Sequence, residues 1–216
     1  MGGNGSALFQ SSVNGPVPPG ATYATVVVSF GQSSNNQSSV GYIDGLSLTF
    51  APSRTPVPQS GIATPTSDPL CAGSLSVTPG MNSVVNGGSE NSDASCTSDI
   101  NVSCWTKTLG NVARVCYGDS GYPDSSDPGP ANPGAWMFFG YSGAFHTAVQ
   151  TLSLPTGEFT YLLSAYIGGY SSQNDRATVL AIFSGNDGSI IGGAIIGPVT
   201  NDEREDTTGL YYREAY

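Results

Sequence analysis

The sequence predicts an all-β fold, an antiparallel β-sandwich of the jelly-roll type. Short runs of β-branched and aromatic residues alternate with turn clusters of Gly, Pro, Asn and Ser, and no convincing amphipathic helix interrupts them. The chain has 29 Gly and 15 Pro in 216 residues, and only 10% of its residues are charged. A chain of this length can bury a substantial core as a single sandwich.

In the N-terminal part, the sequence predicts two strands, 23–30 and 41–50, on either side of a turn cluster at 31–39. We expect them to pair as an antiparallel hairpin. The amino-acid composition then changes to mainly Pro, Thr and Ser. This change indicates a semi-extended linker over 51–70 that can span roughly 60 Å at about 3.1 Å per residue. The predicted organisation is therefore closing strands in 1–50, a linker in 51–70 and a main body in 71–216.

Most of the remaining strands are predicted in the main body. After Ser83–Asn86 comes a cysteine-bearing section, followed by a Gly/Pro/Asp-rich loop over 118–134. The strand predictions in the rest of the body are 135–139, 148–154, 159–167, 177–183, 190–196 and 209–215.

The two ends of the chain resemble the same strand. Ala7–Asn14 and Gly209–Tyr216 align at an offset of 202 positions, and the first of them runs on into Gly15–Ala21. We expect the chain to be about one repeat long and divided within a domain. Residues 1–50 would then supply the closing strands, either to their own chain or to a neighbour.

Composition and charge limit the partners. A net charge of −10 with a single lysine, Lys107, argues against nucleic acid and anionic membranes and suits a cation such as calcium. The Ser/Thr/Asn-rich polar surface is typical of extracellular or cell-surface proteins. The longest apolar stretch, 190–199, is broken by Gly and Pro and is too short to span a membrane, and Met1–Asn4 does not have the features of a signal peptide.

Four cysteines, Cys71, Cys96, Cys104 and Cys116, predict two disulfides in an oxidising compartment. Three pairings are open, and we favour Cys96 with Cys104 and Cys71 with Cys116. Zinc is disfavoured because there is no C-x-x-C pair and only one histidine. Sequons at Asn4, Asn36 and Asn101 permit N-glycosylation in a eukaryotic source, although some arise by chance in such a Ser/Asn-rich chain.

Catalysis finds little support. His146 lies in no nucleophile motif, and we expect it to be a structural histidine satisfied by hydrogen bonds. Four acids in 202–206 flank Arg204 in one short loop, where a solvated acidic loop is the simplest interpretation. We therefore expect no enzymatic activity.

Several short motifs follow one another in a rotated order. They are Val85–Asn91, Cys104–Trp105, Gly134–Gly140, Val149–Gly157, Leu163–Gly169, Thr208–Leu210, Val17–Ala21 and Gly41–Leu48. Taken in this order, they resemble the galactose-binding-like β-jelly-roll modules of bacterial extracellular proteins and carbohydrate-binding modules. The likeness covers most of 7–50 and 84–216, and the family's last two strands come first in this chain.

This resemblance implies a structural calcium ion between the acid after the first strand and the aspartate of the final strand. The matching residues are Glu90 and Asp44, and Asn86 and Asp93 could add oxygen ligands. The alternative is that Glu90 and Asp44 are ordinary strand-end and turn acids.

Carbohydrate binding would use aromatic rings for stacking and planar polar groups for the hydroxyls. Trp136 and Tyr166 lie in predicted strands and are more typical of a core, whereas the loop over 168–176 is better placed to bind a ligand. The full set is Trp105, Trp136, Tyr141, Tyr166, Tyr170, Gln173, Asn174, Asp175 and Arg176, of which we favour Tyr170, Gln173, Asn174, Arg176 and Trp105.

Two functions are compatible with the sequence. The first is a non-enzymatic extracellular structural module that self-associates head to tail by strand complementation into a filament or surface array, with itself as partner. The alternative is a monomeric permuted carbohydrate-binding module that binds glycans. The apparently duplicated strand, the long linker and the Lys-poor, Ser/Gly-rich surface favour the first.

Overall fold

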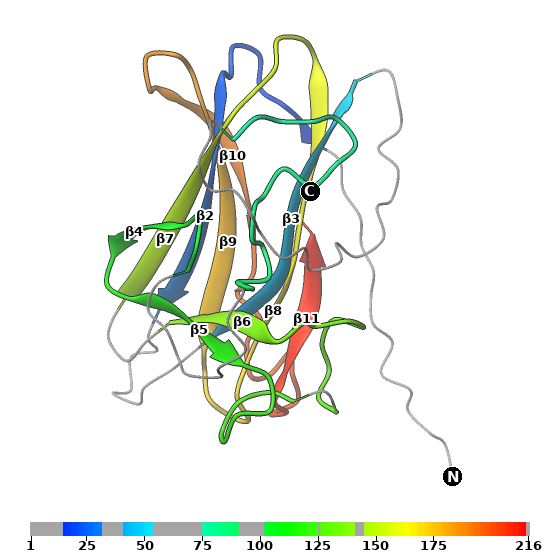
Figure 1. Ribbon diagram of the computed structural model, residues 1–216, viewed down its shortest axis with the longest axis vertical. Coiled ribbons are helices and arrows are strands. Elements are labelled where there is room, and N and C mark those ends of the chain that lie inside the picture. The colour runs from blue at the N-terminus through cyan, green and yellow to red at the C-terminus, as the bar shows by residue number, and fades with distance from the viewer. Residues whose placement is uncertain are drawn as a thin grey trace.

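A computed structural model describes residues 15–31, 41–53, 75–90, 102–124, 126–140 and 145–214. These residues form eleven strands in two antiparallel sheets packed face to face (Figure 1). The described part of the chain contains no helix, and hence no long apolar helix that could cross a membrane. The predicted all-β sandwich is confirmed.

The five-stranded sheet, sheet B, is built around β2 (Tyr23–Gly31). β2 lies between β7 (Phe145–Ser153) and β9 (Arg176–Ser184), with β10 (Ile190–Ile196) beyond β9 and β4 (Thr106–Leu109) beyond β7. Every second side chain of β2 is buried, from Ala24 to Phe30, because successive residues of a strand point to opposite faces.

The six-stranded sheet, sheet A, is built around β3 and β8. β3 (Tyr42–Pro52) lies between β8 (Phe159–Gly169) and β6 (Trp136–Gly140), and β5 (Val112–Cys116) pairs with the far side of β6. The other edge of β8 pairs with two short strands, β1 (Gly15–Pro16) and β11 (Gly209–Glu214).

The main core lies between the two sheets and includes Phe30, Phe50, Phe138, Ile167 and Phe183. A second apolar cluster contains Tyr42, Val115, Met137, Phe139 and Leu210. Tyr122, from the loop after β5, packs edge-on against both Tyr42 and Phe139. Each large apolar side chain buried in this way contributes about 1.5–3 kcal/mol relative to exposure.

The predicted hairpin of 23–30 with 41–50 is wrong. β2 belongs to sheet B and β3 to sheet A, and their pairing partners are β7 and β9 for the first and β6 and β8 for the second. The alternating pattern indicates which side chains are buried but not which strand lies next to which. Two strands that are consecutive in the sequence can therefore lie in opposite sheets of a sandwich.

The Ser83–Asn86 run forms no strand. Side chains accept hydrogen bonds from its backbone: Val84 N donates to Asn82 Oδ1 (3.0 Å) and Val85 N to Gln150 Oε1 (2.8 Å). This competition between side chains and a sheet ladder replaces strand pairing with a turn. β4 and β5, by contrast, lie in the cysteine-bearing section, where no individual strand was predicted.

The N-terminal segment supplies a central strand to each sheet. β2 pairs along its whole length with both neighbours, and β3 pairs with β8 from Tyr42 to Pro52 with one interruption. Residues 15–53 therefore supply strands to both sheets. Most of the predicted linker, 54–70, lies outside the described residues.

Candidate functional site

A bulge in β3 places a carboxylate inside the protein. The register of β3 against β8 shifts between Asp44 and Ser47, and Gly45 in the bulge has a φ of 57°, which favours glycine. The Asp44 side chain is only 2% exposed. Its Oδ1 accepts a hydrogen bond from Gly45 N (2.6 Å), and its Oδ2 accepts one from the Tyr117 hydroxyl (2.7 Å).

A second carboxylate reaches the same place from the turn at 85–90. Gly87 brings this turn against β3, since its carbonyl accepts a hydrogen bond from Leu46 N (3.0 Å) and a Cβ on Gly87 would collide with the Leu46 carbonyl. Glu90 Oε1 accepts hydrogen bonds from Trp136 N (3.0 Å) and Ala135 N (3.1 Å) at the start of β6.

Gly88 lies beside both carboxylates. A Cβ built on Gly88 would lie 3.2 Å from Asp44 Oδ1, a tight contact, and 3.8 Å from Glu90 Oε1. The absence of a side chain on Gly88 therefore lets the two acids lie near the same point. The structure brings Asp44 and Glu90, the two residues matched through the family resemblance, into one region.

Burial dominates the electrostatics of this pair. It raises the pKa of Asp44 well above its ordinary value, and the nearby Glu90 carboxylate raises it further, against the hydrogen bonds from Tyr117 and Gly45. Burial also raises the pKa of Glu90, partly opposed by its backbone hydrogen bonds and by the positive charge of Arg114. Arg114 is itself buried, with its guanidinium carbon 4.0 Å from the centre of the Trp136 ring.

Calcium would need more ligands than these two carboxylates. Ca²⁺ takes six to eight oxygen ligands, so two carboxylates need help from backbone carbonyls and water. Among the described residues no group of three His, Cys, Asp or Glu side chains could hold a metal. Asn86 is buried on the same turn, with Nδ2 donating to Ser103 O (3.1 Å) and Oδ1 without a partner in the described part of the chain. Asp93 lies outside the described residues.

A buried arginine holds the predicted sugar loop. Arg204 is 1% exposed, and its guanidinium donates to the carbonyls of Ser171 (2.9 Å), Gln173 (2.7 Å) and Thr207 (2.6 Å). The buried Asp175 accepts a hydrogen bond from Tyr170 N (2.7 Å) and lies close enough to raise the pKa of Arg204, although burial lowers that pKa more. The loop is therefore fixed from inside.

This arginine was missed at the sequence level. The loop over 202–206 was expected to be solvated, and its four acids are indeed exposed, but Arg204 between them points inward. The signal that could have found it is weak: Arg204 is one of only five arginines, and it follows a strand rich in Gly and Ile.

The other sugar candidates are separated. Tyr170, Gln173 and Asn174 are half-buried in the loop, and Arg176 is exposed at the start of β9. Trp105 lies in the core, where its ring packs edge-on against Phe138 at 5.2 Å and its Nε1 donates to Asn86 O. Its ring is therefore not available for stacking on a sugar. Trp136 is also buried, Tyr166 is half-buried, and Tyr141 lies outside the described residues.

Cys104 and Cys116 are both disulfide-bonded. Cys71 and Cys96 lie outside the described residues, so the predicted pairing stays a prediction, as do the sequons at Asn4, Asn36 and Asn101. His146 is buried in β7, and its Nδ1 accepts a hydrogen bond from Asn111 N (2.9 Å), which agrees with the structural histidine expected from the sequence.

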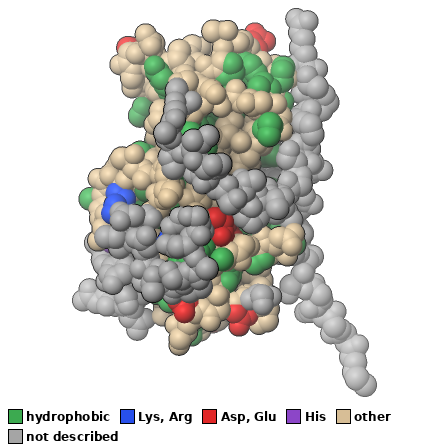
Figure 2. Space-filling view, viewed as in Figure 1, with side chains coloured by type: hydrophobic (Ala, Val, Ile, Leu, Met, Phe, Trp, Pro, Cys, Tyr) green, Lys and Arg blue, Asp and Glu red, His purple; other side chains and the backbone are tan. Residues whose placement is uncertain are grey.

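Sheet B is free of acidic residues. Its five strands contain no Asp or Glu, although the chain has 16 of them. β10 is an edge strand with Ile190 74% exposed and Ile195 58% exposed. On the face drawn in Figure 2, charged side chains form only small, separate patches.

No known protein family, curated protein or solved structure matches this chain.

Proposed function

We propose that this protein is a non-enzymatic extracellular structural module that self-associates head to tail by exchanging its N-terminal strands between copies. The observation that carries the proposal is the position of β2 and β3. Both come from before the linker, and each lies in the middle of a sheet. Apart from the two-residue β1, all the other strands of both sheets come from after the linker.

Neither part of the chain is complete alone. Without β2, the inner edges of β7 and β9 would present unpaired backbone groups, and the core would lose Ala24, Val26, Val28 and Phe30. If β2 and β3 entered the body of a second copy, they would make the same contacts as in their own. Such an exchange between copies gives an open chain unless it closes into a ring.

The charge distribution supports close association. Copies that each carry a charge of −10 repel one another, and an acid-free sheet gives them a surface where this repulsion is weakest. Among the described residues β10 is an end strand of sheet B and carries exposed apolar side chains, which favours contact with another strand.

A structural calcium ion belongs to this proposal. Asp44 comes from the N-terminal segment, whereas Glu90 comes from the body. An ion held by both carboxylates would therefore strengthen the attachment of β3 to whichever body it completes, and it would relieve the repulsion between the buried Asp44 and the half-buried Glu90.

The test is the mass and shape of the protein in solution, measured by light scattering and electron microscopy on the same sample. We expect concentration-dependent oligomers or filaments. A variant that lacks residues 58–68 should shift further toward oligomers, because a shorter linker disfavours closure within one chain. A matched variant with an equal Gly/Ser insertion should shift toward monomer. A compact monomer for all three chains, which is a 22.1 kDa particle for the unmodified protein, would contradict the proposal.

Carbohydrate binding is the second candidate, and the internally fixed loop favours it. Because Arg204 holds the backbone of 171–173, Tyr170, Gln173 and Asn174 would meet a sugar with little ordering cost. A glycan array should then show binding that Tyr170→Ala and Arg176→Ala weaken. Absence of binding by the unmodified protein would exclude this candidate.

A further inference from the structure

The outer edge of β8 is occupied by two strands that lie end to end. β11 pairs with it from Gly209 opposite Gly169 to Glu214 opposite Ser164 (Figure 1). β1 takes the next part of the same edge, with Gly15 opposite Tyr161 and Pro16 opposite Thr160. Both strands run antiparallel to β8.

The register of β1 leads into the place that β11 fills. If β1 were extended toward the N-terminus in the same register, Asn14 would face Leu162, Ser12 would face Ser164 and Ala7 would face Gly169. Residues 7–12 would thus face the β8 residues that now pair with 209–214. The structural register gives the same offset of 202 positions as the sequence comparison of the two ends.

The two segments carry similar apolar side chains at the two positions that pack against an apolar cluster. Leu8 corresponds to Leu210, which is 1% exposed in the second apolar cluster, and Phe9 corresponds to Tyr211, which packs against the main core. A segment with Leu and Phe at these two positions would fill both apolar sites. Its attachment to β1 also gives it a high effective concentration at the edge of β8.

We propose that the β8 edge from Ser164 to Gly169 is a binding site for two segments of the chain, and that Ala7–Asn14 competes there with β11. Only one segment can pair with this edge at a time. In trans, the same segment of a second copy would occupy the edge when N-terminal strands are exchanged, and this part alone rests on the proposed function.

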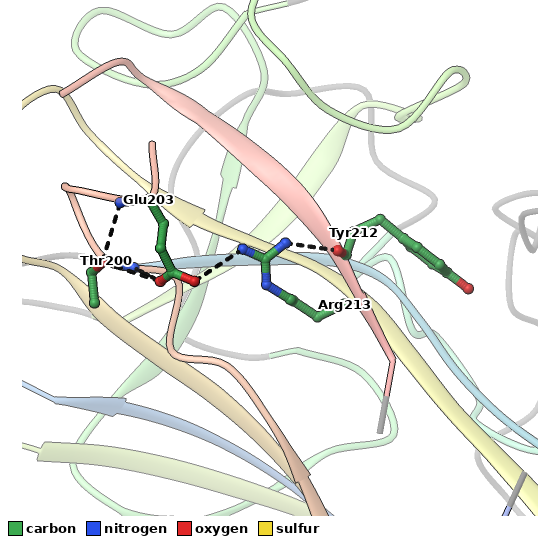
Figure 3. Close-up of polar contacts among 4 residues, drawn as sticks. All are labelled: Thr200, Glu203, Tyr212 and Arg213. Carbon is green, nitrogen blue, oxygen red and sulfur yellow. Dashed lines mark hydrogen bonds and ion pairs between the residues drawn. The ribbon is translucent and has the colours of Figure 1, made fainter. Parts of the chain in front are cut away.

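β11 has several advantages in this competition. Arg213 forms an ion pair with Glu203 (3.4 Å), which in turn is held by Thr200, and Arg213 also donates to the Tyr212 carbonyl (Figure 3). The Tyr212 ring packs against Tyr166 at 5.2 Å. Gln10 and Ser11, the corresponding residues, cannot make these contacts.

Gly209 adds a steric preference for β11. Its φ is 155°, and a Cβ there would lie 2.9 Å from the Pro128 carbonyl oxygen, so Ala7 would have to displace this loop. The ion pair is partly exposed and contributes little. Ala7–Asn14 should therefore be the weaker but competent occupant, detectable when β11 is weakened.

The test is a double-mutant cycle on the full chain, measured as melting temperature at a concentration where light scattering shows monomer. Leu8→Asp alone should change the melting temperature by about 1 °C or less. In a Leu210→Asp background, where 7–14 is expected to take over, Leu8→Asp should lower it further by roughly 5 °C. Ala7→Gly in the same background should raise it, because the clash with Pro128 is removed.

Equal effects of Leu8→Asp in both backgrounds would overturn the proposal. A Leu210→Asp chain that fails to fold would also overturn it, since the second segment would then be unable to replace β11. Because the cycle is measured on the monomer, it is independent of self-association. Coupling between Leu8→Asp and Leu210→Asp in a protein that forms no oligomers would support the shared site and reject the proposed function. Oligomers without this coupling would support the proposed function and reject the shared site.

Discussion

β2 and β3 are both central strands from the N-terminal segment, but they differ in regularity. β2 pairs without interruption with β7 and β9, and its buried side chains are all apolar. β3 has a bulge at Asp44–Ser47, a glycine in the left-handed region and a buried carboxylate. The regular strand builds the core, whereas the irregular strand gives up pairing to bring a charged group against a distant turn.

The largest effect is expected in the regular strand. Phe30→Ala should lower the free energy of unfolding by about 3–5 kcal/mol, because Phe30 is buried between the sheets and its removal leaves a cavity. Chemical denaturation measures this directly. The matched control, Ser29→Ala on the opposite face of β2, should change stability by about 0.5 kcal/mol or less. Similar losses for both variants would mean that β2 does not face the core as described.

Calcium should stabilise the protein through β3, the irregular strand, and not through β2, the regular one. Adding Ca²⁺ at about 100 times its dissociation constant should stabilise the protein by about 2.7 kcal/mol, seen as a higher melting temperature. Asp44→Asn should abolish this rise, since it removes one of the two carboxylates that lie beside Gly88. Ser29→Ala should leave the rise unchanged. A calcium effect that survives Asp44→Asn would place the ion elsewhere.

The pH dependence sharpens the same contrast. Folding raises the pKa of Asp44, so the folded state holds this proton more tightly than the unfolded state does. The resulting stabilisation is fully present below the ordinary carboxyl pKa and is lost as the pH rises through the raised pKa. Asn does not titrate; its Oδ1 can keep the hydrogen bond from Gly45 N, and its Nδ2 can donate to the Tyr117 hydroxyl oxygen in place of accepting from it.

Without calcium, the stability of Asp44→Asn relative to the unmodified protein should therefore increase from about pH 4 to pH 8. The gain should be about 1.4 kcal/mol for each unit by which the pKa is raised. Urea denaturation at several pH values measures it. A constant difference between the two proteins would show that Asp44 ionises as freely in the folded state as in the unfolded state.

The smallest effect is expected at the edge of sheet A. Arg213→Ser should lower the free energy of unfolding by about 0–1 kcal/mol, because its ion pair with Glu203 is partly exposed and screened by salt. The loss should shrink further in 0.5 M NaCl. A loss of several kcal/mol would mean that β11 is a firm structural element and not an exchangeable one.

The sequence predicted the regular part of the molecule well. Alternation in 23–30 and the apolar runs of 159–167 and 177–183 depend on local burial patterns, and these recur in β2, β8 and β9. The sequence did not predict the features that depend on contacts between residues far apart in the chain. Nothing local to 23–30 and 41–50 shows that they enter different sheets, and the bond from Val85 to Gln150 that replaces a strand joins residues far apart in the chain.

The candidate site was only partly predictable. Asp44 and Glu90 came from a family resemblance, and the structure brings them together through Gly87 and Gly88. Trp105 has the residue type of a sugar platform, but its location in the core follows from contacts with Phe138 and Asn86. Arg204 looked like part of a solvated loop because its hydrogen-bond partners are carbonyls, which leave no trace in the sequence.

We propose that residues 15–53 complete a body that cannot close without them, and that they can do so from another chain. The experiment is to produce residues 75–216 alone and to mix them with a separate 1–60 fragment, following thermal unfolding and native mass. We expect the body alone to aggregate or to unfold without cooperativity, and the fragment to restore a cooperative transition in a one-to-one complex. A soluble 75–216 body that unfolds cooperatively by itself would contradict it.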